Sequence, residues 1–235
     1  MNIQTFIFNW RGQYNNTLTK IKQFNTLGIN PIIINSDEKC DAFPDWHNIG
    51  EESYFTAQML KALELFTEDI FFHIQADVSY DNWKKLIDDA LFYYEKYDWG
   101  IYAPNVNYTW YTSERTDVPR LGLPDKNLKM VADTDCTCWF IDRSIIELAN
   151  ERSVDFAPYK MGWSFDIVYS ALAYLNKKPV IRDYSHTVIH PQGTNYNTSQ
   201  AETEMVNFFN TLPYDIKEAF SYIKGNKDNL WKYYS

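Results

Sequence analysis

The sequence predicts an α/β protein in which a mostly parallel central sheet is flanked by helices and followed by a C-terminal helical tail. Short apolar segments alternate, along the first half of the chain, with segments whose apolar residues recur at helical spacing. Several of the short segments are apolar along their whole length, as in strands buried on both faces of a parallel sheet. Strands and helices that alternate in this way pack as a sheet between helical layers.

Each expected element of the first half follows from its own pattern. Leu18, Ile21 and Phe24 recur at helical spacing before Gly28, which marks the end of a helix. Asp81 precedes another helical pattern and is expected to cap that helix. These patterns predict strands at 4–10, 31–37, 69–78 and 99–105, and helices at 13–27, 54–67 and 81–97.

The second half is less regular. Residues 106–135 lose periodicity and hold prolines and charges, so this segment is expected to be functional or mobile. A strand and a helix are expected within "CTCWFIDRSIIELA", and later elements are a helix at about 165–176, a strand at about 179–189 and a helix at about 200–224. We expect one domain over 1–198 and a helical extension over 199–235 that packs on it.

The composition narrows the functional classes. The net charge of −9 disfavours a polyanionic partner unless basic residues gather locally. Part of the 17% aromatic content must fill the core, and the many Tyr and Trp also indicate a surface that stacks on flat or ring-shaped ligands. The odd number of cysteines, Cys40, Cys136 and Cys138, favours a reduced protein. With no signal-peptide pattern and no long apolar segment, the chain is expected to be cytoplasmic and without a membrane span.

Polar residues lie at the predicted ends of three strands. Asp37, Asp77 and Asn105 end them, and ligands bind at the carboxyl ends of the strands in such sheets. Asp77 suits a divalent cation or a diphosphate, although a lone aspartate there is also typical of a turn or cap. Asp37 suits a base or ribose, and a turn within "NSDE" is about equally consistent with the sequence.

Two further residues stand out in the stretch from Met161 to Gly193. Asp166, in "GWSFD", begins a helical pattern beside Trp163 and an aromatic neighbour, which suits a general base or a ligand of a sugar hydroxyl. The other reading is an acid that stabilises the helix dipole. His190 ends an apolar strand, and His186 shares its expected face, but nothing near them in sequence completes a zinc site.

The order of these motifs resembles that of the GT-A glycosyltransferases, whose fold is Rossmann-like, and most closely those of the family-two type. The resemblance covers roughly residues 3–195. Its most specific part is Gly-Trp-x-x-Asp at the head of a helix, followed by a strand that ends in His190. Those enzymes commonly place the first motif beside the acceptor and use the histidine to bind a metal.

The resemblance implies a role for each matching residue. Asp166 would be the catalytic base or an acceptor ligand, and Asp77 and His190 would bind the metal. The nucleotide-sugar donor would be bound by Asn9, Arg11, Asp37, Gln75 and Asp77. The acceptor and the transferred sugar would be bound by Trp110, Asp135, Trp139 and Trp163.

One motif departs from the family pattern. Where the family usually has Asp-x-Asp, this chain has Gln75, Ala76 and Asp77. The second carboxylate is kept, while the first is an amide that hydrogen-bonds but carries no charge. The expected cofactor is therefore a divalent cation, Mn²⁺ or Mg²⁺.

The resemblance implies an enzyme that transfers a sugar from a nucleotide-diphosphate sugar to an acceptor hydroxyl. The expected acceptor is a glycan or a small polar molecule. One alternative is a phage-type enzyme that glycosylates hydroxymethylated DNA bases, which the charge of −9 disfavours. Another is a non-catalytic module that binds nucleotide or carbohydrate, which the missing first carboxylate favours.

Overall fold

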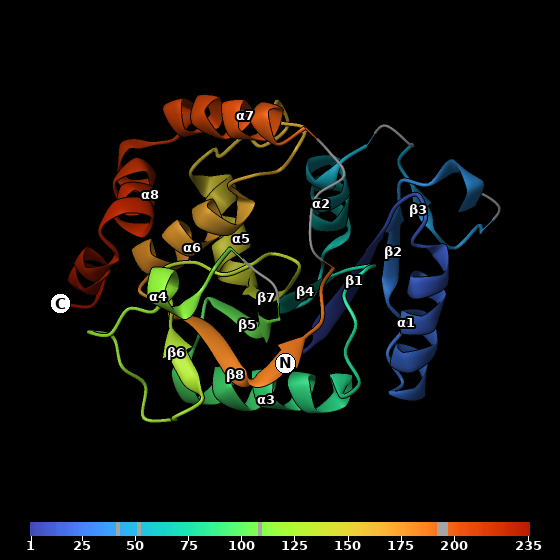
Figure 1. The fold of residues 1–235 in the computed structure, drawn as a ribbon, viewed down its shortest axis with the longest axis horizontal. Helices are drawn as coiled ribbons and strands as arrows, with labels where there is room; N and C mark the ends of the chain where they lie inside the picture. The colour runs from blue at the N-terminus through green and yellow to red at the C-terminus, as the bar shows by residue number, and fades with distance from the viewer. Residues whose placement is uncertain (41–42, 51–52, 108–109, 192–196) are drawn as a thin grey trace.

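A computed structural model describes residues 1–40, 43–50, 53–107, 110–191 and 197–235. Its centre is an eight-stranded sheet in the order β3-β2-β1-β4-β7-β5-β8-β6 (Figure 1). The strands are β1 (Ile3–Asn9), β2 (Ile32–Asn35), β3 (His47–Asn48), β4 (Ile70–Gln75), β5 (Ile101–Val106), β6 (Leu128–Met130), β7 (Cys138–Asp142) and β8 (Val180–Val188).

The sheet is mostly parallel, as the sequence predicts. Strand β1 pairs in parallel with β2 and β4, and β5 pairs in parallel with β8. Strand β7 lies between β4 and β5 and is antiparallel to both, and β6 is antiparallel to β8. Because β7 runs against its neighbours, its first residue lies at the edge where those neighbours end.

Helices cover both faces of this sheet (Figure 1). Helices α1 (Tyr14–Thr26) and α3 (Trp83–Tyr97) pack on one face. The other face carries α2 (Phe55–Leu65), α5 (Arg143–Glu151) and α6 (Phe165–Leu175). The same core includes α7 (Thr198–Thr211) and α8 (Tyr214–Gly225), which are followed by the 3-10 segment Lys227–Tyr234. Two short helical elements, Glu38–Cys40 and α4 (Ser113–Thr116), lie in loops.

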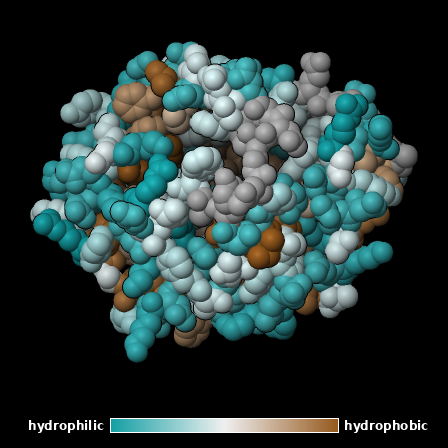
Figure 2. Space-filling model, in the orientation of Figure 1, coloured by the Kyte–Doolittle hydropathy of each residue, from teal (hydrophilic) through white to brown (hydrophobic). Residues whose placement is uncertain are grey.

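Aromatic side chains fill much of the space between these layers. Phe72 and Phe140 face each other on β4 and β7 and stack with their ring centroids 3.8 Å apart. On the other face, Phe165 of α6 stacks on Phe156 at 3.9 Å and meets the edge of Phe55 at 5.6 Å. Much of the aromatic content noted in the sequence is therefore core. The surface in Figure 2 is largely hydrophilic, with hydrophobic side chains in small separate areas.

The structure corrects two details of the sequence prediction. The cap of α3 is Asn82, whose side-chain oxygen accepts from the backbone N–H of Lys85, and not Asp81. The tail helix expected at about 200–224 is two helices, because Pro213 follows α7 and its ring cannot continue a helix. The segment 106–135 contains α4 and β6, which have no clear sequence pattern.

Gly162 occupies a position where both the backbone conformation and the space around Cα favour glycine. It precedes α6, has a φ of +77°, and an added Cβ would lie 2.6 Å from Cδ1 of Phe55. We predict that Gly162→Ala lowers the free energy of unfolding by about 3 kcal/mol, because backbone strain and overpacking act together. Urea denaturation measures this change.

Two other glycines provide matched controls. Gly12 has a φ of +88° but open space around its Cα, so Gly12→Ala is expected to show backbone strain alone, about 1 kcal/mol. Gly122 has neither feature, and Gly122→Ala is expected to change stability by less than about 0.5 kcal/mol. Equal losses in all three variants would contradict this account of Gly162.

Candidate functional site

Four of the residues singled out in the sequence lie at one edge of the sheet. Gln75 ends β4 and Asp77 follows it, His190 follows β8, and Asp135 precedes β7. Strands β4 and β8 end at this edge, and the antiparallel β7 begins there. The reversal of β7 thus adds a carboxylate that a purely parallel sheet would place at the opposite edge.

Asp77 and His190 face each other. The imidazole Nε2 lies 3.6 Å from Oδ2 of Asp77, and each side chain is 16% exposed. Oδ1 of Asp77 is buried and has no hydrogen-bond partner among the described residues. Burial raises the pKa of Asp77, while the nearby charges of His190 and Lys20 oppose that rise. An unpaired carboxylate oxygen beside an imidazole nitrogen fits a divalent cation such as Mn²⁺.

Backbone contacts hold these two side chains in place. Ser79 and Ile189 form an antiparallel bridge. The backbone nitrogen of Ser79 lies 2.8 Å from the backbone oxygen of Ile189, and the nitrogen of Ile189 lies 2.9 Å from the oxygen of Ser79. The backbone N–H of His190 also donates to Oδ1 of Asn107 at 2.8 Å. The segment after β4 and the end of β8 are therefore joined directly.

Lys20 is a site neighbour that sequence reasoning missed. It lies on α1, is 4% exposed, and donates through Nζ to the backbone oxygen of Ala76 at 2.5 Å. Burial lowers the pKa of Lys20 to about 8, and the negative charge of Asp77 opposes that decrease. A lysine on an amphipathic helix gives no sequence signal for this contact.

Asp166 lies in the first turn of α6 and is 6% exposed. The hydroxyl of Tyr111 donates to its Oδ2, and the backbone N–H of Ile167 donates to its Oδ1 at 2.9 Å. Burial raises the pKa of Asp166, as the sequence suggested, and the hydrogen bond from Tyr111 opposes that rise. The charge of Asp135 raises the pKa of both Asp77 and Asp166, so Asp135 lies within electrostatic reach of both.

Asp133 is a second buried acid near Asp166. Burial raises the pKa of Asp133 to about 7, and the charge of Asp166 adds to that rise. Lys224, Arg182 and Arg115 oppose it. Lys224 belongs to α8, so the C-terminal helices contribute a cation to this part of the site.

The residues expected to bind the nucleotide are partly used in internal contacts. Asn9 is fully buried, donates to Oδ1 of Asn35 at 2.7 Å and accepts from Thr17 at 2.6 Å. The carboxylate of Asp37 accepts from the backbone N–H of Lys39 at 3.0 Å, which is the turn that the sequence left open. A nucleotide contact by Asp37 stays a prediction, as it does for the exposed Arg11.

The tryptophans expected to stack on sugars are placed differently from one another. Trp139 has no exposed surface and packs against Tyr169 with ring centroids 6.0 Å apart, so it lies in the core rather than at the sheet edge. Trp110 is 70% exposed and Trp163 is half-buried. Stacking by these two stays a prediction.

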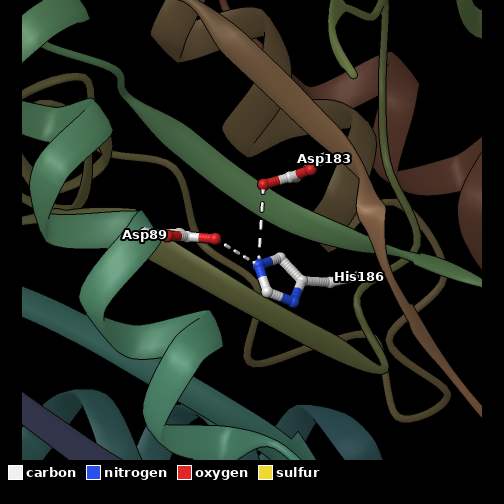
Figure 3. Close-up of side chains that lie close together, drawn as sticks. All are labelled: Asp89, Asp183 and His186. Atoms are coloured by element: carbon white, nitrogen blue, oxygen red, sulfur yellow. Dashed lines mark hydrogen bonds and ion pairs between the residues drawn. The ribbon is translucent and has the colours of Figure 1, made fainter.

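A further group that could hold a cation lies between α3 and β8 (Figure 3). Nε2 of His186 lies 2.7 Å from Oδ2 of Asp89 and 3.8 Å from Oδ2 of Asp183. Two ligands of one tetrahedral zinc lie about 3.3 Å apart, because each is about 2.0 Å from the metal. The 2.7 Å separation is therefore that of a hydrogen bond. The sequence prediction did not find this group, because it did not consider Asp183, three residues before His186, and because Asp89 is distant in the chain.

No family model matches the sequence, and no curated protein matches it. Solved structures do match. Residues 1–349 of TarS from S. aureus, in complex with UDP-GlcNAc, superpose with a TM-score of 0.59 at 11% identity, covering 100% of this chain and 74% of that one. GalNAc-T7 with UDP, GalNAc and Mn²⁺ superposes with a TM-score of 0.61 at 10% identity, covering 99% of this chain and 54% of that one. A further S. aureus TarS structure superposes with a TM-score of 0.63 at 9% identity, covering 98% of this chain and 43% of that one.

These neighbours are glycosyltransferases, and the chain has their GT-A fold, which confirms the expected architecture. At 9–11% identity the likeness shows the fold alone. This chain spans only about half of GalNAc-T7 and less than half of the second TarS structure. Among the described residues, no helix is long and apolar enough to cross a membrane.

The pKa of Asp133 predicts a pH dependence of stability. The folded protein holds this proton up to about pH 7, whereas an unfolded chain releases it near 3.8. Stability from the protonated form is present below pH 3.8 and is lost as the pH rises to about 7. Asn cannot ionise, so Asp133→Asn removes this loss. Relative to wild type, the free energy of unfolding of the variant should rise by ~1.4 kcal/mol for each pH unit within that window.

Urea denaturation at pH 5, 6, 7 and 8 measures this difference. Asp45→Asn is the control, because Asp45 is exposed. A stability difference between Asp133→Asn and wild type that does not change with pH would show that Asp133 is ionised in the folded protein throughout.

Proposed function

We propose that this protein transfers a sugar from a nucleotide-diphosphate sugar to an acceptor hydroxyl. The observation that carries the proposal is the gathering of Asp77, His190, Asp135 and Asp166 around one edge of a GT-A sheet. Glycosyl transfer needs a site for a diphosphate and a base for the acceptor, and these residues supply chemistry for both. The structural neighbours with UDP-GlcNAc or UDP support a uridine nucleotide as the first donor to test.

The diphosphate would lie over the ends of β4 and β8. Asp77 and His190 would hold a divalent cation, which when bound neutralises charge on the leaving diphosphate. Manganese is the first choice because one neighbour contains it. Lys20 adds a positive charge within electrostatic reach of Asp77, and Gln75 offers an uncharged hydrogen-bonding group where many such enzymes have another carboxylate.

Asp166 is proposed as the general base. As the acceptor oxygen attacks the anomeric carbon, its proton passes to the Asp166 carboxylate, and the bond from that carbon to the diphosphate oxygen breaks. Burial raises the pKa of Asp166, which favours proton uptake. Tyr111 now donates to Oδ2 of Asp166, so the acceptor hydroxyl would take the place of that phenol.

The acceptor is proposed to be a glycan or a small polar molecule. Trp110 and Trp163 are partly or largely exposed and offer surfaces for sugar rings. Burial raises the pKa of Asp133 and the positive charges of Lys224 and Arg115 oppose that rise, so these cations interact with acids of the site and not only with an incoming acceptor. The net charge of −9 favours such an acceptor over DNA.

Two single substitutions separate donor binding from transfer. Asp77→Asn should abolish the manganese-dependent stabilisation by UDP, because it removes a charged metal ligand. Asp166→Asn should keep that stabilisation but release UDP from UDP-sugars at least about 100-fold more slowly, since it removes the base. Thermal shift with UDP, GDP, TDP, CDP and CMP, each with and without Mn²⁺, measures binding, and a UDP-release assay measures turnover.

The control is Asp45→Asn, which removes an exposed carboxylate and should match wild type in both assays. UDP release that is unaffected by Asp166→Asn would remove the base from the mechanism. Nucleotide binding by a wild-type protein that shows no turnover with any donor would instead indicate a binding module on a transferase fold.

A further inference from the structure

Strand β8 reaches Asp77 by an irregular path. In the sheet, β7 and β5 lie between β4 and β8. Three strand spacings separate β4 from β8, which is about 14 Å. His190 nevertheless lies 3.6 Å from Asp77, so the end of β8 must turn across the edge of the sheet.

A bulge in β8 makes this turn. Pro104 of β5 pairs with Asp183, but the next residue, Asn105, pairs with Thr187. The three residues between them, 184–186, have no register partner on β5. Bulges bend a strand and change the direction of the side chains that follow, and they are frequent beside active sites.

Asp183 fixes the start of the bulge. It is fully buried, and its Oδ1 accepts from the backbone N–H of Ser185 at 2.8 Å and from the Ser185 hydroxyl at 2.6 Å. Its Oδ2 accepts from the hydroxyl of Tyr102 at 2.5 Å. These bonds tie the bulge to itself and to β5.

His186 fixes the end of the bulge. It is 1% exposed, and Figure 3 shows its ring pointing between Asp89 of α3 and Asp183. Nδ1 lies 2.7 Å from the hydroxyl of Tyr80, and Nε2 lies 2.7 Å from Oδ2 of Asp89. With the proton assigned to Nε2, the ring donates to Asp89 and accepts from Tyr80, so both nitrogens are satisfied.

Tyr80 links this network to the metal-binding end of the site. It follows Asp77 by three residues, and Ser79 between them pairs with Ile189. The segment 77–80 therefore meets the segment 186–190 at three successive points. Asp77 faces His190, Ser79 pairs with Ile189, and the hydroxyl of Tyr80 bonds to His186.

We propose that His186, with Tyr80 and Asp89, is a positioning residue that holds the β8 bulge and thereby sets His190 opposite Asp77. The inference rests on the proposed function in one respect, that His190 and Asp77 bind the metal. The imidazole acts through hydrogen bonds to its two neighbours and touches neither nucleotide nor sugar.

Two conservative variants test this role. Tyr80→Phe removes one hydroxyl and Asp89→Asn removes one charge, and each leaves the side-chain volume nearly unchanged. Both should speed amide hydrogen exchange at Ser79 and Ile189 by about fivefold or more, because the backbone bridge loses its support. Both should weaken the affinity for Mn²⁺ in the presence of UDP by about tenfold or more, as lost support of a metal ligand does.

Matched controls are Asp88→Asn and Tyr214→Phe. Asp88 adjoins Asp89 but faces solvent and pairs with Lys84, and Tyr214 is 81% exposed on α8. Exchange at the core amide of Phe6 reports global destabilisation, so the ratio of the Ser79 and Ile189 rates to the Phe6 rate isolates the local effect.

Exchange ratios and Mn²⁺ affinities equal to those of the controls would overturn the inference. Faster exchange without weaker Mn²⁺ binding would overturn it as well, because His190 would then be set by other contacts. Wild-type protein without manganese-dependent UDP binding would contradict the proposed function, and the exchange ratios would then decide by themselves whether His186 holds the bulge.

Discussion

The short antiparallel contact between the segment after β4 and the end of β8 is the constraint on which the site depends. Strands β4 and β8 are not neighbours, yet the segments that follow them meet where Ser79 and Ile189 pair across the edge of the sheet. The antiparallel β7 between them brings Asp135 to the same place. The crossing contact thus brings the imidazole of His190 to Asp77, and the reversed strand adds the carboxylate of Asp135.

Such a concentration of acids is stable only with compensation from outside the edge. Burial raises the pKa values of Asp77, Asp133 and Asp166, and cations from distant elements oppose each rise. Lys20 comes from α1, and Lys224 comes from α8. The N-terminal helix and the C-terminal helices therefore contribute to the electrostatics of a site whose acids lie in the middle of the chain.

The sequence predicted those parts of the structure that depend on local patterns. The places of Asp77 and His190 just after their strands, and of Asp166 in the first turn of its helix, follow from periodicity, because an apolar run shows roughly where a strand stops. Contacts between segments that are distant in the chain have no local sequence pattern and could not be predicted in this way. The phenol of Tyr111 and the ammonium of Lys20 reach the site through tertiary packing. The burial of Trp139 could not be predicted for the same reason: a strand buried on both faces does not reveal which aromatic ring faces the core.

The most direct test of the central claim is a crystal structure of the protein grown with UDP and Mn²⁺, with the manganese located by its anomalous signal. We expect a manganese peak within coordinating distance of both Asp77 and His190, with the diphosphate of UDP bound to the same ion. A peak among Asp89, Asp183 and His186 with none at Asp77, or a diphosphate bound away from the ends of β4 and β8, would contradict it.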